Sequence, residues 1–157
     1  MDHNPYTPPS AKVEVADARR GSAVKAVILG MLADLVGSMV AGALAMAAYG
    51  AYLGATGSTP DEAATTMDGM NYDSPLGIAL TIVGCLFSVL GGYVCARVAR
   101  HAEYRLGAIM SAISAVLVVL SASDDARPIV TAVFCVATLA SIMAGAHLGA
   151  AKNKTGR

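Results

Sequence analysis

The chain has 157 residues, of which 55% are hydrophobic and 14% are charged, and its 11 basic and 11 acidic residues give a formal net charge of zero. An ordinary soluble domain carries about 25% charged residues, so this composition excludes that class of protein. Little of the chain is left for a soluble catalytic domain, and we expect no enzymatic activity.

Four apolar segments make up most of the chain. They cover residues 26–53, 76–96, 106–123 and 128–151, and Asp34 is the only Asp, Glu, Lys or Arg in any of them. A hydrocarbon layer about 30 Å thick needs about 20 apolar residues per spanning helix. The sequence therefore predicts an all-α, polytopic membrane protein. We expect an antiparallel bundle of four transmembrane helices within residues 23–151.

Residues 1–22 precede the first apolar segment and are expected to form a flexible tail. They are polar and contain several prolines, which favour extended backbone. The two arginines at residues 19–20, followed by an apolar run, imitate a secretory signal peptide. That run continues to Leu53, longer than the 7–15 apolar residues of a signal, so we expect the first helix to be retained.

Positive charge is sorted along the chain, and this sorting predicts the orientation. Ten cations flank one set of helix ends: Lys12, Arg19, Arg20, Lys25, Arg97, Arg100, Arg105, Lys152, Lys154 and Arg157. The loop at residues 54–75 contains four acidic residues and no Lys or Arg, and Arg127 is the one cation on that side. By the positive-inside rule both termini, including the tail at residues 152–157, are cytoplasmic and the 54–75 loop lies outside.

Helix-start signals stand at the predicted outer ends. Residues 59–62 read Thr-Pro-Asp-Glu, the arrangement of a capping box with proline at the first helical position, and predict a short surface helix over residues 60–67. Ser74 before Pro75 repeats the signal at the second apolar segment, and two aspartates at residues 124–125 precede the fourth. The short connection before the fourth segment makes the last two helices antiparallel neighbours.

Small residues recur at four-residue spacing within the apolar segments. The candidate helix-contact glycines are Gly37 and Gly42 in the first segment, Gly84 and Gly92 in the second, and Gly145 and Gly149 in the fourth. In lipid, such rows let helix backbones approach closely. They predict either contacts within the bundle or a face for self-association or for another membrane protein.

Asp34 is the centre of a candidate polar site inside the membrane. A charged carboxylate within a span costs roughly 2.5–3.5 kcal/mol on insertion scales, so Asp34 needs either a partner or a proton. The expected partners are His147, Tyr93 or a Ser or Thr hydroxyl. Three roles remain open: a structural hydrogen bond, a proton or cation relay, and a contact with a partner protein.

No motif indicates a catalytic, cofactor or metal site. His147 has no second His or Cys three or four residues away in the sequence. Cys85, Cys95 and Cys135 lie inside apolar segments without the spacing of a zinc or redox motif, and we interpret them as small helix-contact residues. We expect no cofactor.

A short basic stretch at residues 97–105 joins the second and third segments. Its arginines, Arg97, Arg100 and Arg105, are expected to contact anionic lipid head groups, with about 1 kcal/mol per cation near the membrane surface. The stretch is too small for a nucleic-acid interface. The expected partner at this end is therefore the bilayer and not a nucleic acid.

Three segments carry a resemblance. Residues 4–9 read Asn-Pro-Tyr-Thr-Pro-Pro, residues 34–38 read Asp-Leu-Val-Gly-Ser, and residues 91–97 read Gly-Gly-Tyr-Val-Cys-Ala-Arg. Together they resemble small, uncharacterised four-span bacterial inner-membrane proteins whose N-terminal tail reads Asn-Pro-Tyr-x-Pro-Pro. The resemblance implies a multi-pass protein of the bacterial inner membrane. It implies no activity, because none is assigned to such proteins.

Two functional hypotheses follow. The first is a non-enzymatic accessory, scaffold or immunity-type protein that acts through helix–helix contacts, either as a homo-oligomer or with another membrane protein. The alternative is a small oligomeric transporter or channel subunit that uses Asp34. A pathway needs several polar groups facing one lumen at different depths, and Asp34 and His147 are the only ionisable candidates apart from the thiols. That scarcity favours the first hypothesis.

Overall fold

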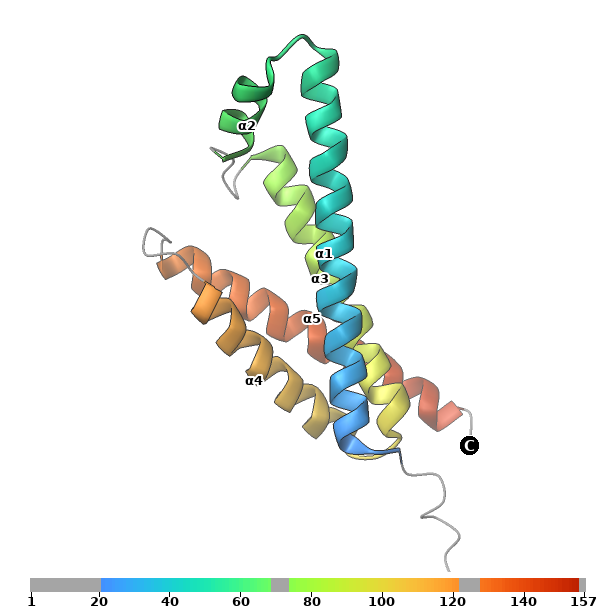
Figure 1. The fold of residues 1–157 in the computed structure, drawn as a ribbon. Helices are drawn as coiled ribbons and strands as arrows, with labels where there is room; N and C mark the ends of the chain where they lie inside the picture. The colour runs from blue at the N-terminus through green and yellow to red at the C-terminus, as the bar shows by residue number, and fades with distance from the viewer. Residues whose placement is uncertain (1–20, 69–73, 122–127, 156–157) are drawn as a thin grey trace, which may run out of the picture.

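The computed structural model describes residues 21–68, 74–121 and 128–155, and the regular structure in these ranges is helical. The helices are α1 (Ala23–Ala55), α2 (Pro60–Asp68), α3 (Pro75–Ala99), α4 (Glu103–Ser121) and α5 (Pro128–Thr155) (Figure 1). All except α2 are long and apolar enough to cross a membrane. The predicted all-α fold with four apolar spans is confirmed, and the chain is a multi-pass membrane protein.

The helix bounds follow the apolar segments of the sequence. The predicted segments 26–53, 76–96 and 128–151 lie inside α1, α3 and α5, while segment 106–123 begins inside α4 and runs past its last residue, Ser121. Several predictions fall outside the described residues. They concern the tail with its Asn-Pro-Tyr-x-Pro-Pro start, and the loop residues Asp73, Asp124, Asp125 and Arg127.

The helix starts are capped as predicted. The Thr59 amide donates to Glu62 Oε2 (2.8 Å) and the Glu62 amide donates to Thr59 Oγ1 (3.4 Å), which completes the capping box of α2. The hydrogen bond from the Thr59 amide lowers the pKa of the Glu62 carboxyl. At the start of α3, Ser74 Oγ accepts a hydrogen bond from the Gly77 amide across 3.0 Å.

α3 and α4 are joined by a tight turn. Within it Arg100 (φ 54°) and Ala102 (φ 47°) adopt the left-handed conformation. The carbonyl oxygen of Ala99 accepts a hydrogen bond from the Gly21 amide (3.1 Å) and lies 2.6 Å from Nδ1 of His101. Most of the predicted basic stretch therefore lies in helix ends, and the backbone just before α1 is tied to the end of α3.

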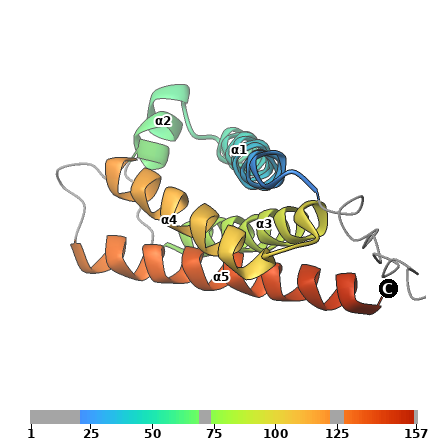
Figure 2. The same cartoon turned by 90° about the horizontal axis from the view of Figure 1, so that it is seen from below.

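α3 occupies the centre of the helix arrangement. It contacts α1 on one side and α5 on the other, and α4 lies along α5 while also touching α3 and α1 (Figure 2). In the described part of the chain, α1 and α5 make no contact with each other. α1 stands at a steep angle to α4 and α5, so the helices meet toward one end and diverge toward the other (Figure 1).

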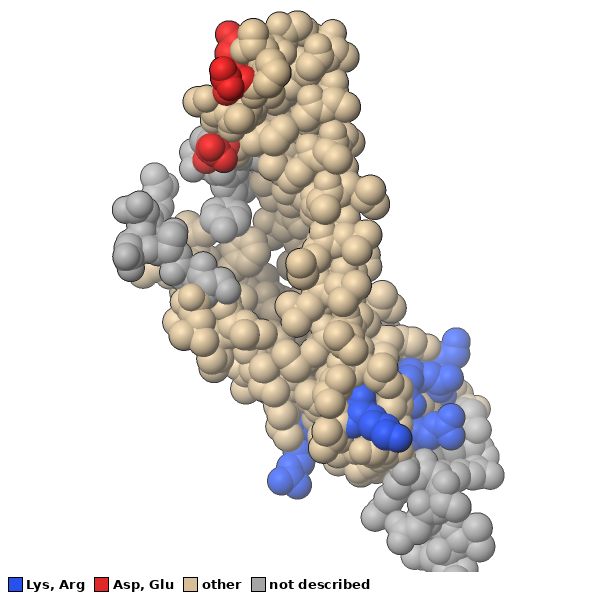
Figure 3. Space-filling view, in the orientation of Figure 1, with Lys and Arg blue, Asp and Glu red and all other residues tan. Residues whose placement is uncertain are grey.

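Charged side chains define two ends of the molecule. The cation-rich end carries Lys25, Arg97, Arg100, Arg105, Lys152 and Lys154, and the acidic end carries Asp61, Glu62 and Asp68 of α2. Figure 3 shows blue and red atoms at opposite ends of one face, with a surface of uncharged residues between them. Asp34 lies in the apolar part and Glu103 lies at the cation-rich end.

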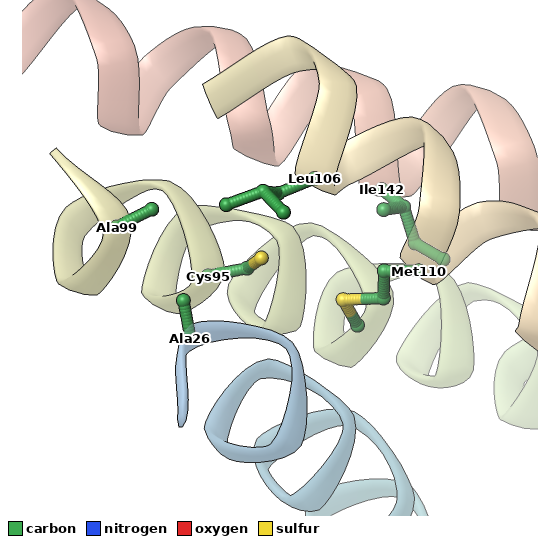
Figure 4. Packing of buried hydrophobic residues seen from close by; sticks show 6 residues of the cluster. All are labelled: Ala26, Cys95, Ala99, Leu106, Met110 and Ile142. Carbon is green, nitrogen blue, oxygen red and sulfur yellow. The ribbon is translucent and has the colours of Figure 1, made fainter. Parts of the chain in front are cut away.

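The buried core lies in the half of the molecule nearer the cation-rich end. A cluster of buried hydrophobic residues draws on all four long helices and consists of Ala26, Cys95, Ala99, Leu106, Met110 and Ile142 (Figure 4). Toward the acidic end, large apolar side chains stay open, and Leu44, Leu120 and Ile129 are 67%, 76% and 78% exposed. The buried hydrophobic residues of the described chain therefore lie toward the cation-rich end.

Candidate functional site

Asp34 is buried between α1 and α3 and is bonded to a serine of the facing helix. Ser88 Oγ donates a hydrogen bond to Asp34 Oδ1 across 3.0 Å, and the two residues are 8% and 6% exposed. A hydroxyl on the neighbouring helix satisfies part of the hydrogen-bonding capacity of the carboxyl group without a second charge in the apolar layer. Of the predicted partners for Asp34, the structure selects a hydroxyl.

This bond lies where the backbones of α1 and α3 approach closely. A Cβ added to Gly30 would lie 2.8 Å from the carbonyl oxygen of Gly91, and one added to Gly91 would lie 2.7 Å from the carbonyl oxygen of Gly30. The side chain of Met110, from α4, lies about as close to both positions, at 3.0 Å and 2.9 Å. Asp34 is therefore held in a contact of three helices.

The other two candidate partners of Asp34, His147 and Tyr93, do not contact it. The hydroxyl of Tyr104, from α4, lies 2.9 Å from Nδ1 of His147, and the two rings are 6.1 Å apart between centroids. His147 belongs to α5, which is separated from α1 by α3. Tyr93 follows Gly91 by two residues, which places it about 200° further round α3, away from α1.

Glycines bring α3 and α5 into backbone contact. A Cβ added to Gly92 would collide with the carbonyl oxygen of Ile142, and one added to Gly145 would collide with the carbonyl oxygen of Val89. At Gly149 an added Cβ would lie 2.8 Å from another carbonyl oxygen of α3. These three predicted glycines therefore lie at a helix–helix contact within the chain.

The other three predicted glycines differ from one another. Gly37 lies under the ring of Phe87, a side chain of α3 with which an added Cβ would collide. Gly42 and Gly84 have no such neighbour, because nothing lies within 4 Å of a Cβ added to either. Contacts within the bundle therefore account for Gly37, Gly92, Gly145 and Gly149, and not for Gly42 or Gly84. The helices diverge toward the acidic end and leave these two glycines without a facing backbone.

Asn153 joins three helices at the cation-rich end, and no sequence pattern marks it. Its side chain is 9% exposed, and its Nδ2 donates to the carbonyl oxygen of Ala96 (2.9 Å) and to Glu103 Oε1 (3.2 Å). Arg97 Nη1 donates to Asn153 Oδ1 across 3.1 Å. The guanidinium of Arg97 is thus held by an amide of α5, whereas the sequence indicated only a contact with lipid.

The remaining predicted positions are spread over the surface and the core. Arg100 and Arg105 are exposed at the cation-rich end, and their contact with lipid stays a prediction. All three cysteines are free thiols, with Cys95 buried in the core and Cys85 and Cys135 half-buried. Across the described ranges, no group of three or more His, Cys, Asp or Glu side chains is placed to hold a metal ion.

Known proteins provide no further guide. No protein-family model matches the chain, and neither a curated protein nor a solved structure is similar to it. The fold and the contacts between helices are therefore the basis for a functional proposal.

Gly92→Ala is expected to destabilise the protein, because its Cβ would overlap the backbone of Ile142 and α5 would have to shift. Overpacking of this kind costs about 1–3 kcal/mol. Gly84→Ala on the same helix is the matched control, since it fills open space and exchanges glycine for a better helix former, a gain of up to about 1 kcal/mol. Thermal unfolding in mild detergent measures both variants. If Gly92→Ala melts at the same temperature as the wild type, Gly92 does not lie at the contact between α3 and α5.

Asp34→Asn is expected to fold normally, because its amide oxygen can still accept a hydrogen bond from Ser88. Asp34→Leu and Ser88→Ala should each lose this bond and unfold at a slightly lower temperature, since interhelical hydrogen bonds in membranes average about 0.6 kcal/mol. The measurement is thermal unfolding together with proton flux in proteoliposomes. A flux that is present in the wild type and absent in a well-folded Asp34→Asn variant would show a relay instead of a structural bond.

Proposed function

We propose that this protein is a non-enzymatic protein of the bacterial inner membrane that acts through helix–helix contacts, as an accessory, scaffold or immunity-type subunit. The observation that carries this proposal is the divergence of the helices toward the acidic end (Figures 1 and 3). In that half, the described part of the chain provides no neighbour for the glycines at residues 42 and 84.

These open glycines distinguish the diverging half from an ordinary lipid-facing surface. Large apolar side chains suit contact with lipid, whereas glycine inside a helix costs about 1 kcal/mol relative to alanine. Gly42 lies on α1 and Gly84 on α3, both on the acidic side of the bond between Asp34 and Ser88. Small residues in lipid permit the close approach of another helix. The partner is therefore a membrane helix, from a second copy of this chain or from another membrane protein.

Burial of Asp34 supports a contact role over the alternative of a small oligomeric transporter or channel subunit. A pathway needs its ionisable group to face a water-filled lumen. Asp34 is instead enclosed where Gly30, Gly91 and Met110 meet, and its Oδ1 accepts from Ser88. A carboxyl group in that position stabilises an interhelical contact.

The orientation belongs to the same proposal. The described Lys and Arg residues lie at one end of the apolar helices, and Asp61, Glu62 and Asp68 lie at the other. The positive-inside rule places the cation-rich end in the cytoplasm. Both termini are then cytoplasmic and α2 lies on the outer side. The resemblance to four-span bacterial proteins supports the inner membrane as the location.

Reporter fusions test the orientation. A fusion at residue 65, in α2, should be active outside the cytoplasm. Fusions at residues 101 and 157 should be active inside it, because ten of the eleven cations lie at the same helix ends as these two residues. A cytoplasmic signal from residue 65 would reverse the whole topology.

Association is tested by the mass of the purified protein in mild detergent, together with any co-purifying membrane protein. Gly42→Leu and Gly84→Leu should lower the fraction in the complex, because a large side chain keeps another backbone away. Nothing lies within 4 Å of a Cβ at either position, and leucine is a better helix former than glycine, so the monomer should not unfold at a lower temperature. Gly54→Leu is the matched control, because Gly54 is equally open but lies past the end of the apolar segment 26–53, where a partner helix in the membrane does not reach. A monomer without partners, or equal complex formation by all three variants, would contradict the proposal.

A further inference from the structure

Arg97 is a half-buried cation that forms no ion pair with the described residues, and the carboxylate of Glu103 lies one amide side chain away. Its Nη1 donates to Asn153 Oδ1, and this is the hydrogen bond that its side chain makes among the described residues. A guanidinium has five N–H donors, so four of them point to no partner in that part of the protein. A partly buried charge with unused donors favours an anion that can accept several hydrogen bonds at once.

Asn153 bonds to both Arg97 and Glu103. Its Oδ1 accepts from Arg97 while its Nδ2 donates to Glu103 Oε1, so the amide stands between the cation and the acid. A further bond from Nδ2 to the carbonyl oxygen of Ala96 fixes the amide, which is 9% exposed. Asn153 therefore holds the guanidinium in place and leaves its charge available.

The surroundings of Arg97 match the head-group layer of a bilayer. Arg97 lies in the last turn of α3, where the apolar span ends, and Lys152 and Lys154 flank Asn153 in the last turns of α5. These lysines are exposed and add positive potential at the same end of the molecule. Basic pockets between transmembrane helices at this level bind anionic phospholipid head groups.

We propose that Arg97, held in place by Asn153, binds the phosphate of an anionic phospholipid. Arginine presents paired N–H groups that match two phosphate oxygens, which gives the contact a defined geometry beyond simple attraction. The site differs from a general basic surface because it joins the end of α3 to the end of α5 through one buried amide. The same chemistry would accept inorganic phosphate, but the position of Arg97 at the end of an apolar span assigns the phosphate to a lipid.

The test is native mass spectrometry of the full-length protein in mild detergent with equal amounts of phosphatidylglycerol and phosphatidylcholine. The wild type should retain phosphatidylglycerol preferentially. Arg97→Gln should lower the bound ratio at least tenfold, because hydrogen bonds to a charged group contribute about 1.5–3 kcal/mol. Asn153→Asp should lower it as much, because the new carboxylate pairs with Arg97 and occupies its donors.

Arg105→Gln is the matched control, because it removes an exposed arginine from the same end and lowers the net charge by one, as the other two variants do. We expect it to lower the ratio no more than about fivefold, the effect of one exposed cation that contributes about 1 kcal/mol. Equal losses in all three variants would show a diffuse electrostatic surface and overturn the proposal. An unchanged ratio in folded Arg97→Gln and Asn153→Asp would also overturn it, with circular dichroism reporting the helix content. Displacement of phosphatidylglycerol by an equal concentration of inorganic phosphate would overturn the assignment to a lipid.

Discussion

Two adjacent glycines of α3, Gly91 and Gly92, fix the arrangement of the other helices. Successive residues of an α-helix point about 100° apart, so Gly91 faces α1 while Gly92 faces α5. A side chain at either position would meet a carbonyl oxygen, of Gly30 in the first case and of Ile142 in the second. Because lipid provides no hydrophobic force between helices, their association depends on such close contacts. The central place of α3 follows from this glycine pair.

The polar site depends on the same close approach. A serine side chain is short, and Ser88 reaches Asp34 because Gly30 and Gly91 let the two backbones come together. The crossing that makes this bond possible also encloses the carboxyl group, with Met110 covering the crossing from α4. Helix contact and polar contact therefore stabilise each other, and a larger residue at either glycine would weaken both.

Features set by residues close together in the chain can be predicted from the sequence, as the four spans and the caps at Thr59 and Ser74 show. Contacts between helices also depend on how each helix is rotated about its axis. These helices are apolar on all sides, so no stripe marks the buried face. The sequence therefore cannot select Ser88 over His147 as the partner of Asp34. It also cannot show that Gly92 contacts another helix while Gly84 does not. Asn153, among lysines, looks like part of a solvated tail, yet it is buried because α5 continues to Thr155.

The two proposed interactions use different parts of one helix. Gly84 and Arg97 are about 20 Å apart along α3 at 1.5 Å per residue, beyond the separation within which substitutions usually influence each other. The hydrogen bonds that join helices around Asp34 and Asn153 lie on the cation-rich side of Gly84. A partner helix that enters between the diverging halves would leave those bonds in place. If the two sites are separate, a substitution at Gly84 should weaken association and leave the preference for anionic lipid unchanged. A substitution at Arg97 should weaken the lipid preference and leave association unchanged.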